Sequence, residues 1–88
     1  MTLVEDVIDT WKAYLAALEE DNKAAIAEER HELLYDIRNF LFANGALSAK
    51  GLDALVKARI PVARVSAGVV AVTLDDGEVV ELTEDQRR

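Results

Sequence analysis

The 88-residue chain contains no cysteine and only one histidine. The lack of cysteine excludes a disulfide framework, a thiolate zinc site and a cysteine nucleophile, and it is consistent with a reducing compartment. No apolar run approaches the roughly 20 residues that span a bilayer. The first residues also lack the basic segment and apolar core of a signal peptide. We therefore expect a cytoplasmic protein that makes no membrane contact.

Catalytic motifs are equally scarce. The sequence has no glycine-rich phosphate loop, no nucleophile elbow and no metal-ligand set. Glu28 and His31 form a Glu-x-x-His pair, half of the motif of di-iron bundles, but only a dimer could complete a site from one histidine. The same stretch resembles the zinc-protease motif, except that Tyr35 stands where a second histidine is required. We expect a solvated acidic helix face, no enzyme activity and no cofactor.

The net charge of −7 is distributed unevenly. Residues 1–36 sum to −7, residues 37–64 to +4 and residues 65–88 to −4. The negative net charge opposes binding to nucleic acid and to anionic membranes. Only the positively charged middle segment favours such binding. An acidic surface over residues 1–36 that mimics nucleic acid for a basic partner is a further hypothesis.

Hydrophobic periodicity predicts two long helices, over residues 3–20 and 22–43. Thr2 and Glu5 have the spacing of a capping box at the start of the first helix. The apolar stripes of the two segments do not share one phase, and residues 19–23 between them contain good capping residues. We favour a tight turn there, which makes an antiparallel helical hairpin. One long kinked helix is the alternative.

A third helix is predicted over residues 49–60. Ser48 is the expected N-cap, and Leu47 and Leu52 have the spacing of a hydrophobic staple. Pro61 ends the helix, because a residue that precedes proline disfavours helical angles.

Residues 64–83 are rich in valine and predict a β-hairpin. A three-residue loop closed by Gly77 pairs Val72 with Val80 and Val70 with Leu82, which separates an apolar face from a mixed one. Gly68 is expected to mark a bulge or a bend after residues 62–65. The carboxylates of Asp75, Asp76 and Glu78 are interpreted as a loop tip, since a calcium loop needs ligands over about twelve residues.

These elements predict a single α+β domain over residues 1–88. It is mainly helical, with an N-terminal antiparallel helical hairpin, a short third helix and a C-terminal β-hairpin. Residues 84–88 are expected to form a frayed tail.

The function that we favour is a non-enzymatic protein–protein interaction or accessory module of bacterial or phage type. The long helices carry more large apolar residues than one short hairpin covers, so we predict a homodimer at micromolar concentration. Tryptophan and tyrosine are enriched at binding hot spots, and packing in the core is the competing interpretation of the aromatic residues. The candidate interface residues are Trp11, Tyr14, Leu18, Tyr35 and Phe40.

The alternative is a winged-helix-like DNA-binding regulator, whose order of elements this chain resembles. Residues 48–60 take the place of the recognition helix and residues 69–83 that of the wing. The basic residues that follow Ser48 form a candidate anion-facing patch, which comprises Lys50, Lys57, Arg59 and Arg64. The acidic loop tip, the long first helices and the small number of cations count against this interpretation, so nucleic acid is the less favoured partner.

Overall fold

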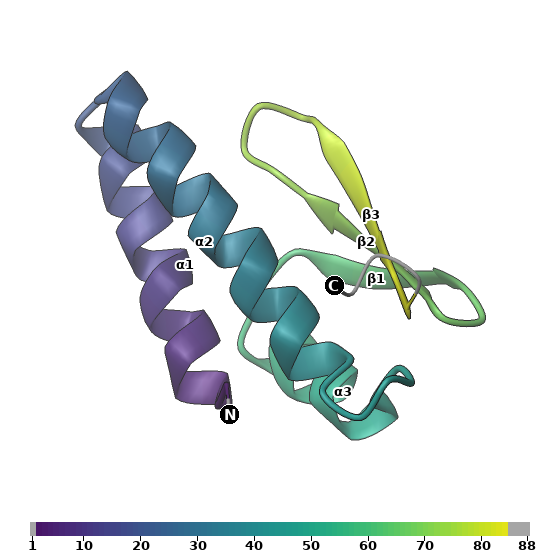
Figure 1. The fold of residues 1–88 in the computed structure, drawn as a ribbon. Helices are drawn as coiled ribbons and strands as arrows, with labels where there is room; N and C mark the ends of the chain where they lie inside the picture. The colour runs from purple at the N-terminus through teal and green to yellow at the C-terminus, as the bar shows by residue number, and fades with distance from the viewer. Residues whose placement is uncertain (1, 85–88) are drawn as a thin grey trace.

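The computed structural model describes residues 2–84, which form three helices followed by an antiparallel sheet of three strands (Figure 1). The predicted α+β class is confirmed. The helices are α1 (Val4–Glu19), α2 (Lys23–Leu41) and α3 (Ala49–Lys57), and the strands are β1 (Val62–Ser66), β2 (Val69–Thr73) and β3 (Val79–Thr83). The sheet has the order β1-β2-β3. Residues 85–88 of the predicted tail lie outside the described residues.

The start of α1 differs by one residue from the predicted capping box. Leu3, and not Thr2, is the N-cap, and the Asp6 carboxylate accepts a hydrogen bond of 2.8 Å from the backbone N–H of Leu3. The prediction of a Thr2–Glu5 pair was wrong because the acidic residue that reaches back is Asp6. A carboxylate in the first turn also complements the positive end of the helix dipole.

A tight turn joins α1 to α2, as the sequence predicts in preference to a kinked helix. The N–H groups of Asp21 and Asn22 donate to the carbonyls of Leu18 (3.1 Å) and Ala17 (3.3 Å), the hydrogen-bond pair of a Schellman motif. Asp21 lies in the left-handed region, with φ of 53°. Asn22 then caps α2, since its side-chain oxygen accepts from the N–H of Ala25. One turn therefore ends a helix and begins the next.

The second helix is slightly shorter than predicted. It ends at Leu41 rather than at residue 43, and Phe42 is its C-cap. Both side chains are fully buried. Leaving the helix at this point lets two consecutive large side chains enter the core, which a continuing helix would direct about 100° apart.

The third helix begins as predicted and ends early. The Ser48 hydroxyl accepts from the N–H of Gly51 at 3.0 Å, which confirms the N-cap. The helix ends at Lys57 and not at residue 60, because Arg59 has φ of 66° and turns the chain. The N–H groups of Arg59 and Ile60 donate to carbonyls of the last helical turn, forming a second Schellman motif.

The register of β2 against β3 is the predicted one. Val72 lies opposite Val80 and Val70 opposite Leu82. Gly77, with φ of 85°, provides the left-handed residue of the loop.

The first strand was not predicted as a strand. Residues 62–65 are expected only to lead into the hairpin, through a bulge or bend at Gly68, whereas in the structure they belong to β1, which pairs with β2 and places Val62 opposite Val72. The bulge lies between Arg64 and Ser66, and Gly68, with φ of 72°, forms the turn into β2. The hairpin is thus the second half of a three-stranded meander, because an extended segment beside a hairpin satisfies its backbone groups by pairing.

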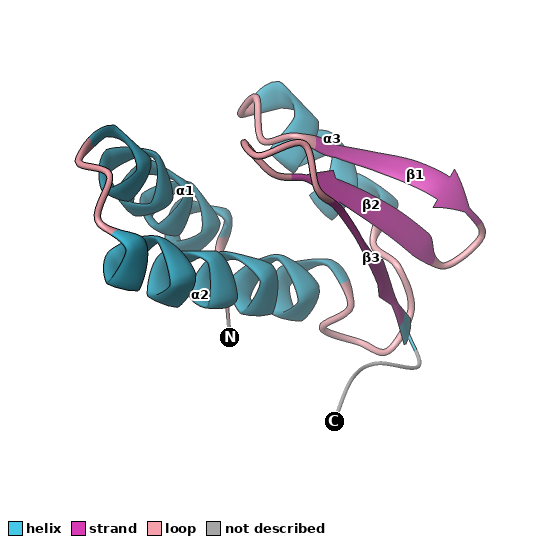
Figure 2. Cartoon of the chain, turned by 90° about the horizontal axis from the view of Figure 1, so that it is seen from above, coloured by secondary structure: helices cyan, strands magenta, loops and turns pink. Residues whose placement is uncertain are grey.

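One core joins the helices to a single face of the sheet. Figure 2 shows α1 and α2 on one side of the three strands. Burial of apolar area from every element stabilises this arrangement. The buried cluster comprises Val7, Tyr14, Leu33, Ile37, Leu41, Phe42, Leu55, Ile60, Val62, Val70, Val72, Leu74 and Leu82.

Candidate interaction surfaces

The face of the sheet directed away from the core is the first candidate surface. Side chains alternate between the two faces of a strand, and Val62, Val70, Val72 and Leu82 face the core. The residues paired between them point outward. We name this set the outer sheet face, which comprises Ala63, Ser66, Val69, Ala71, Thr73, Val79, Glu81 and Thr83.

The outer sheet face has little charge. Glu81 is the one charged residue of the set, in a chain in which 31% of residues are charged. Val79 and Ala63 are exposed, and Val69 and Ala71 on the central strand are half-buried. Its low charge makes this exposed face a candidate docking site. The predicted β2–β3 register already separates the two faces, but the β character of residues 62–65 does not reveal that this segment pairs with β2.

The predicted helical interface residues lie mostly in or against the core. Tyr14 is only 2% exposed, and Trp11, Leu18 and Phe40 are partly buried against the core cluster. The Trp11 and Tyr14 rings stack with their centroids 5.9 Å apart. Tyr35 differs, since it is 54% exposed on α2. The arrangement supports the core-packing interpretation of Trp11 and Tyr14, because the sheet covers the helical hairpin within one chain.

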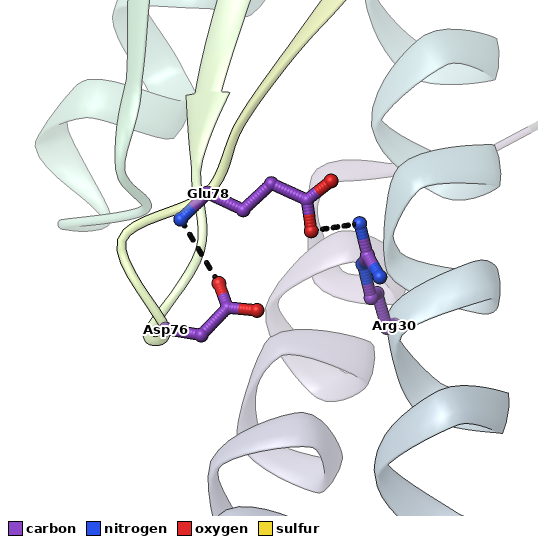
Figure 3. A network of polar contacts seen from close by, with 3 residues as sticks. All are labelled: Arg30, Asp76 and Glu78. Carbon is purple, nitrogen blue, oxygen red and sulfur yellow. Dashed lines mark hydrogen bonds and ion pairs between the residues drawn. The ribbon is translucent and has the colours of Figure 1, made fainter.

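The acidic loop between β2 and β3 is held against the helical hairpin. Arg30 of α2 forms an ion pair with Glu78, and the Asp76 carboxylate accepts from the N–H of Glu78 at 3.0 Å (Figure 3). Burial raises the pKa of the Tyr14 phenol above its ordinary value, and an interaction with the backbone of Asp75 opposes this rise. A loop anchored in this way is directed toward the helices.

The predicted anion-facing patch is solvent-exposed throughout. Lys57 forms an ion pair of 3.0 Å with Asp53, one helical turn earlier. Within residues 2–84, the side chains of Lys50, Arg59 and Arg64 make no hydrogen bond or ion pair. These three cations are therefore available to a ligand.

The hairpin that the winged-helix interpretation takes as the wing, residues 69–83, is the second of two hairpins that follow α3. The hairpin that directly follows α3 is β1–β2, and its turn contains Ala67 and Gly68. The predicted wing at residues 69–83 is instead tied to α2 through Glu78. The candidate recognition helix has nine residues, and its exposed side includes Asp53 as well as the two lysines.

The acidic residues near His31 form no metal centre in this arrangement. Glu28, His31 and Glu32 are exposed on α2. In the described part of the chain, no group of three or more His, Cys, Asp or Glu side chains is placed to hold a metal ion.

None of the helices described within residues 2–84 has the length and apolar character needed to cross a membrane. Comparison with protein-family models, with curated proteins and with solved structures finds no match to this chain.

Proposed function

We propose that this chain is a non-catalytic protein-interaction module that self-associates through the outer sheet face. The observation that supports the proposal is the low charge of this exposed face in a strongly acidic chain. Exposed apolar patches on one face of an antiparallel sheet are commonly covered by a second sheet, as in a β-sandwich.

The outer sheet face suits contact with a second copy of the chain better than the other surfaces of the molecule do. The net charge of −7 repels another copy, and the outer sheet face, with Glu81 alone, minimises that repulsion. Glu81 lies on β3, an edge strand. A twofold pairing that lays β1 of one copy over β3 of the other places the two Glu81 carboxylates at opposite rims.

The size of the face predicts weak association. Three strands of five residues cover roughly 14 Å by 17 Å at ordinary strand spacing and rise per residue. The area of the face is well below the area of about 800 Å² that each partner buries in a stable interface. We therefore expect a dissociation constant of roughly tens of micromolar or weaker, which is weaker association than the dimer at micromolar concentration that the sequence predicts.

Ala71→Glu tests this proposal, because Ala71 lies on the central strand of the face. Sedimentation equilibrium over a range from micromolar to millimolar concentration should show a monomer–dimer equilibrium for the wild type and a monomer for the variant. Ala16→Glu, on the exposed side of α1, is the matched control and should dimerise like the wild type. A wild type that remains at 9.7 kDa throughout, or equal dimerisation of Ala71→Glu, would contradict the proposal.

We also propose that the module acts in the cytoplasm, on the basis of its cysteine-free composition. The winged-helix-like regulator receives less support, since the loop at residues 75–78 is held against α1 and α2 and Asp53 lies among the cations of α3.

A further inference from the structure

Arg59 combines a basic side chain with an unfavourable backbone conformation. Within residues 2–84, Arg59 and Asp21 are the non-glycine residues with positive φ. Arg59 occupies the left-handed position that follows a helix, where glycine is the most favourable residue. A side chain at this position lowers the stability of the fold relative to glycine. The backbone conformation therefore does not explain why this residue is arginine.

The folded chain supplies little that would favour arginine at this position. The guanidinium is exposed and forms no hydrogen bond or ion pair with the described residues. A cation near the end of α3 interacts favourably with the helix dipole, but Lys57 in the last turn already provides one. The turn from α3 into β1 requires the left-handed conformation but not an arginine, and residues held in sparsely populated backbone conformations cluster at binding sites.

Three further exposed cations lie on α3 and β1, the elements that flank Arg59. Lys57 lies two residues earlier, Lys50 is exposed at the start of α3, and Arg64 is on β1, which contacts α3. None of these residues belongs to the outer sheet face. Val56, which is 51% exposed, adds an apolar contact beside Lys57 on α3.

We propose that this basic surface, composed of Lys50, Val56, Lys57, Arg59 and Arg64, binds an acidic segment of a partner protein that also carries apolar side chains. Arg59 contributes one charged contact with that segment. The partner differs from the second copy that covers the outer sheet face, and the two surfaces act independently.

The composition of the basic surface favours a peptide over a nucleic acid. Val56 offers an apolar contact that a phosphate backbone does not use, and Asp53 repels phosphates. A net charge of −7 also opposes a polyanion much longer than the surface itself. A short acidic segment is repelled less than a long polyanion, because fewer of its charges lie near the acidic remainder of the molecule.

The experiment separates binding from stability at Arg59. The probe is a short fluorescein-labelled peptide of glutamates with interspersed leucines, titrated by fluorescence anisotropy at physiological ionic strength. The substitution Arg59→Gly should weaken peptide binding about fivefold, the upper range for one exposed ion pair. The same variant should unfold at a higher temperature than the wild type, because glycine relieves the left-handed strain. Arg59→Lys should retain most of the binding.

Lys12→Ala is the control, since it removes an exposed cation of α1 at a distance from the basic surface; it should bind the peptide like the wild type. The titration is repeated in the Ala71→Glu background, so that failure of self-association does not affect the result. The proposal is overturned by a wild type that does not bind the peptide, by equal binding of Arg59→Gly, by a lowered unfolding temperature of Arg59→Gly, or by tighter binding of duplex DNA than of the peptide.

Discussion

Asp21 in the α1–α2 turn has the same left-handed backbone conformation as Arg59 and the same Schellman hydrogen-bond pattern. Its N–H donates to the carbonyl of Leu18, and the next residue, Asn22, caps α2. The left-handed conformation lets a single residue reverse the chain between the two helices. Aspartate is tolerated there because its short polar side chain is among the few that adopt this region.

Replacing Asp21 by glycine should stabilise the protein by about 0.5–1 kcal/mol, because glycine adopts a positive φ without steric strain. Urea denaturation followed by circular dichroism measures the change. Glu20→Gly is the matched control: its φ of −79° is ordinary helical geometry, so glycine there should destabilise. Equal effects of the two substitutions would show that the positive φ of Asp21 carries no strain.

Among the structural elements, the β2–β3 hairpin depends on the helices for its position. Its loop contacts α2 through the Arg30–Glu78 ion pair, and Leu74, at the start of the loop, is buried in the core. The loop therefore contributes to the packing of sheet on helices although its sequence is acidic and rich in turn residues.

A double-mutant cycle of Arg30→Ala and Glu78→Ala should give a favourable coupling energy of up to about 1 kcal/mol, which high salt should reduce. The measurement is the free energy of unfolding of the four proteins at low and high salt. The Lys57–Asp53 pair serves as the comparison, since both of its side chains are more exposed, and its coupling should be smaller. A coupling energy that salt does not change would argue against an electrostatic tether.

Across the whole molecule, charge is sorted by surface. The helical hairpin carries most of the acidic residues and the outer sheet face is nearly uncharged. Of the six exposed lysines and arginines within residues 2–84, four lie on α3, in the turn after it or on β1. This sorting supports separate surfaces for a second copy and for an acidic partner. It also implies repulsion among the carboxylates of α1 and α2.

Added sodium chloride should therefore raise the midpoint of thermal unfolding by a few degrees, because salt screens like charges in the folded chain. Differential scanning calorimetry at low and physiological salt measures this shift. In the double variant Glu19→Lys/Glu20→Lys, the net charge falls from −7 to −3, and the shift should shrink. A salt response that is equal in both proteins would indicate that the acidic residues of the turn do not destabilise the fold.

Much of the fold follows from local chemistry and is therefore readable in the sequence. Ser48 and Asn22 cap helices wherever their side chains can reach a free N–H, and Gly77 closes a three-residue loop because it adopts positive φ. The β2–β3 register follows from matching apolar residues on one face. Each of these features depends on contacts between residues that are near in sequence.

The tertiary structure alone decided which surfaces face solvent. The stripe that contains Trp11 and Tyr14 looks the same in sequence whether the sheet or a second copy covers it, and the fold places Tyr14 in its own core. The strand at residues 62–66 forms because β2 is adjacent, and this pairing creates the outer sheet face. The conformation of Arg59 likewise depends on how α3 must turn to enter β1. Burial is a property of the assembled chain, so composition and periodicity determine which residues can be buried, and long-range packing determines which ones are.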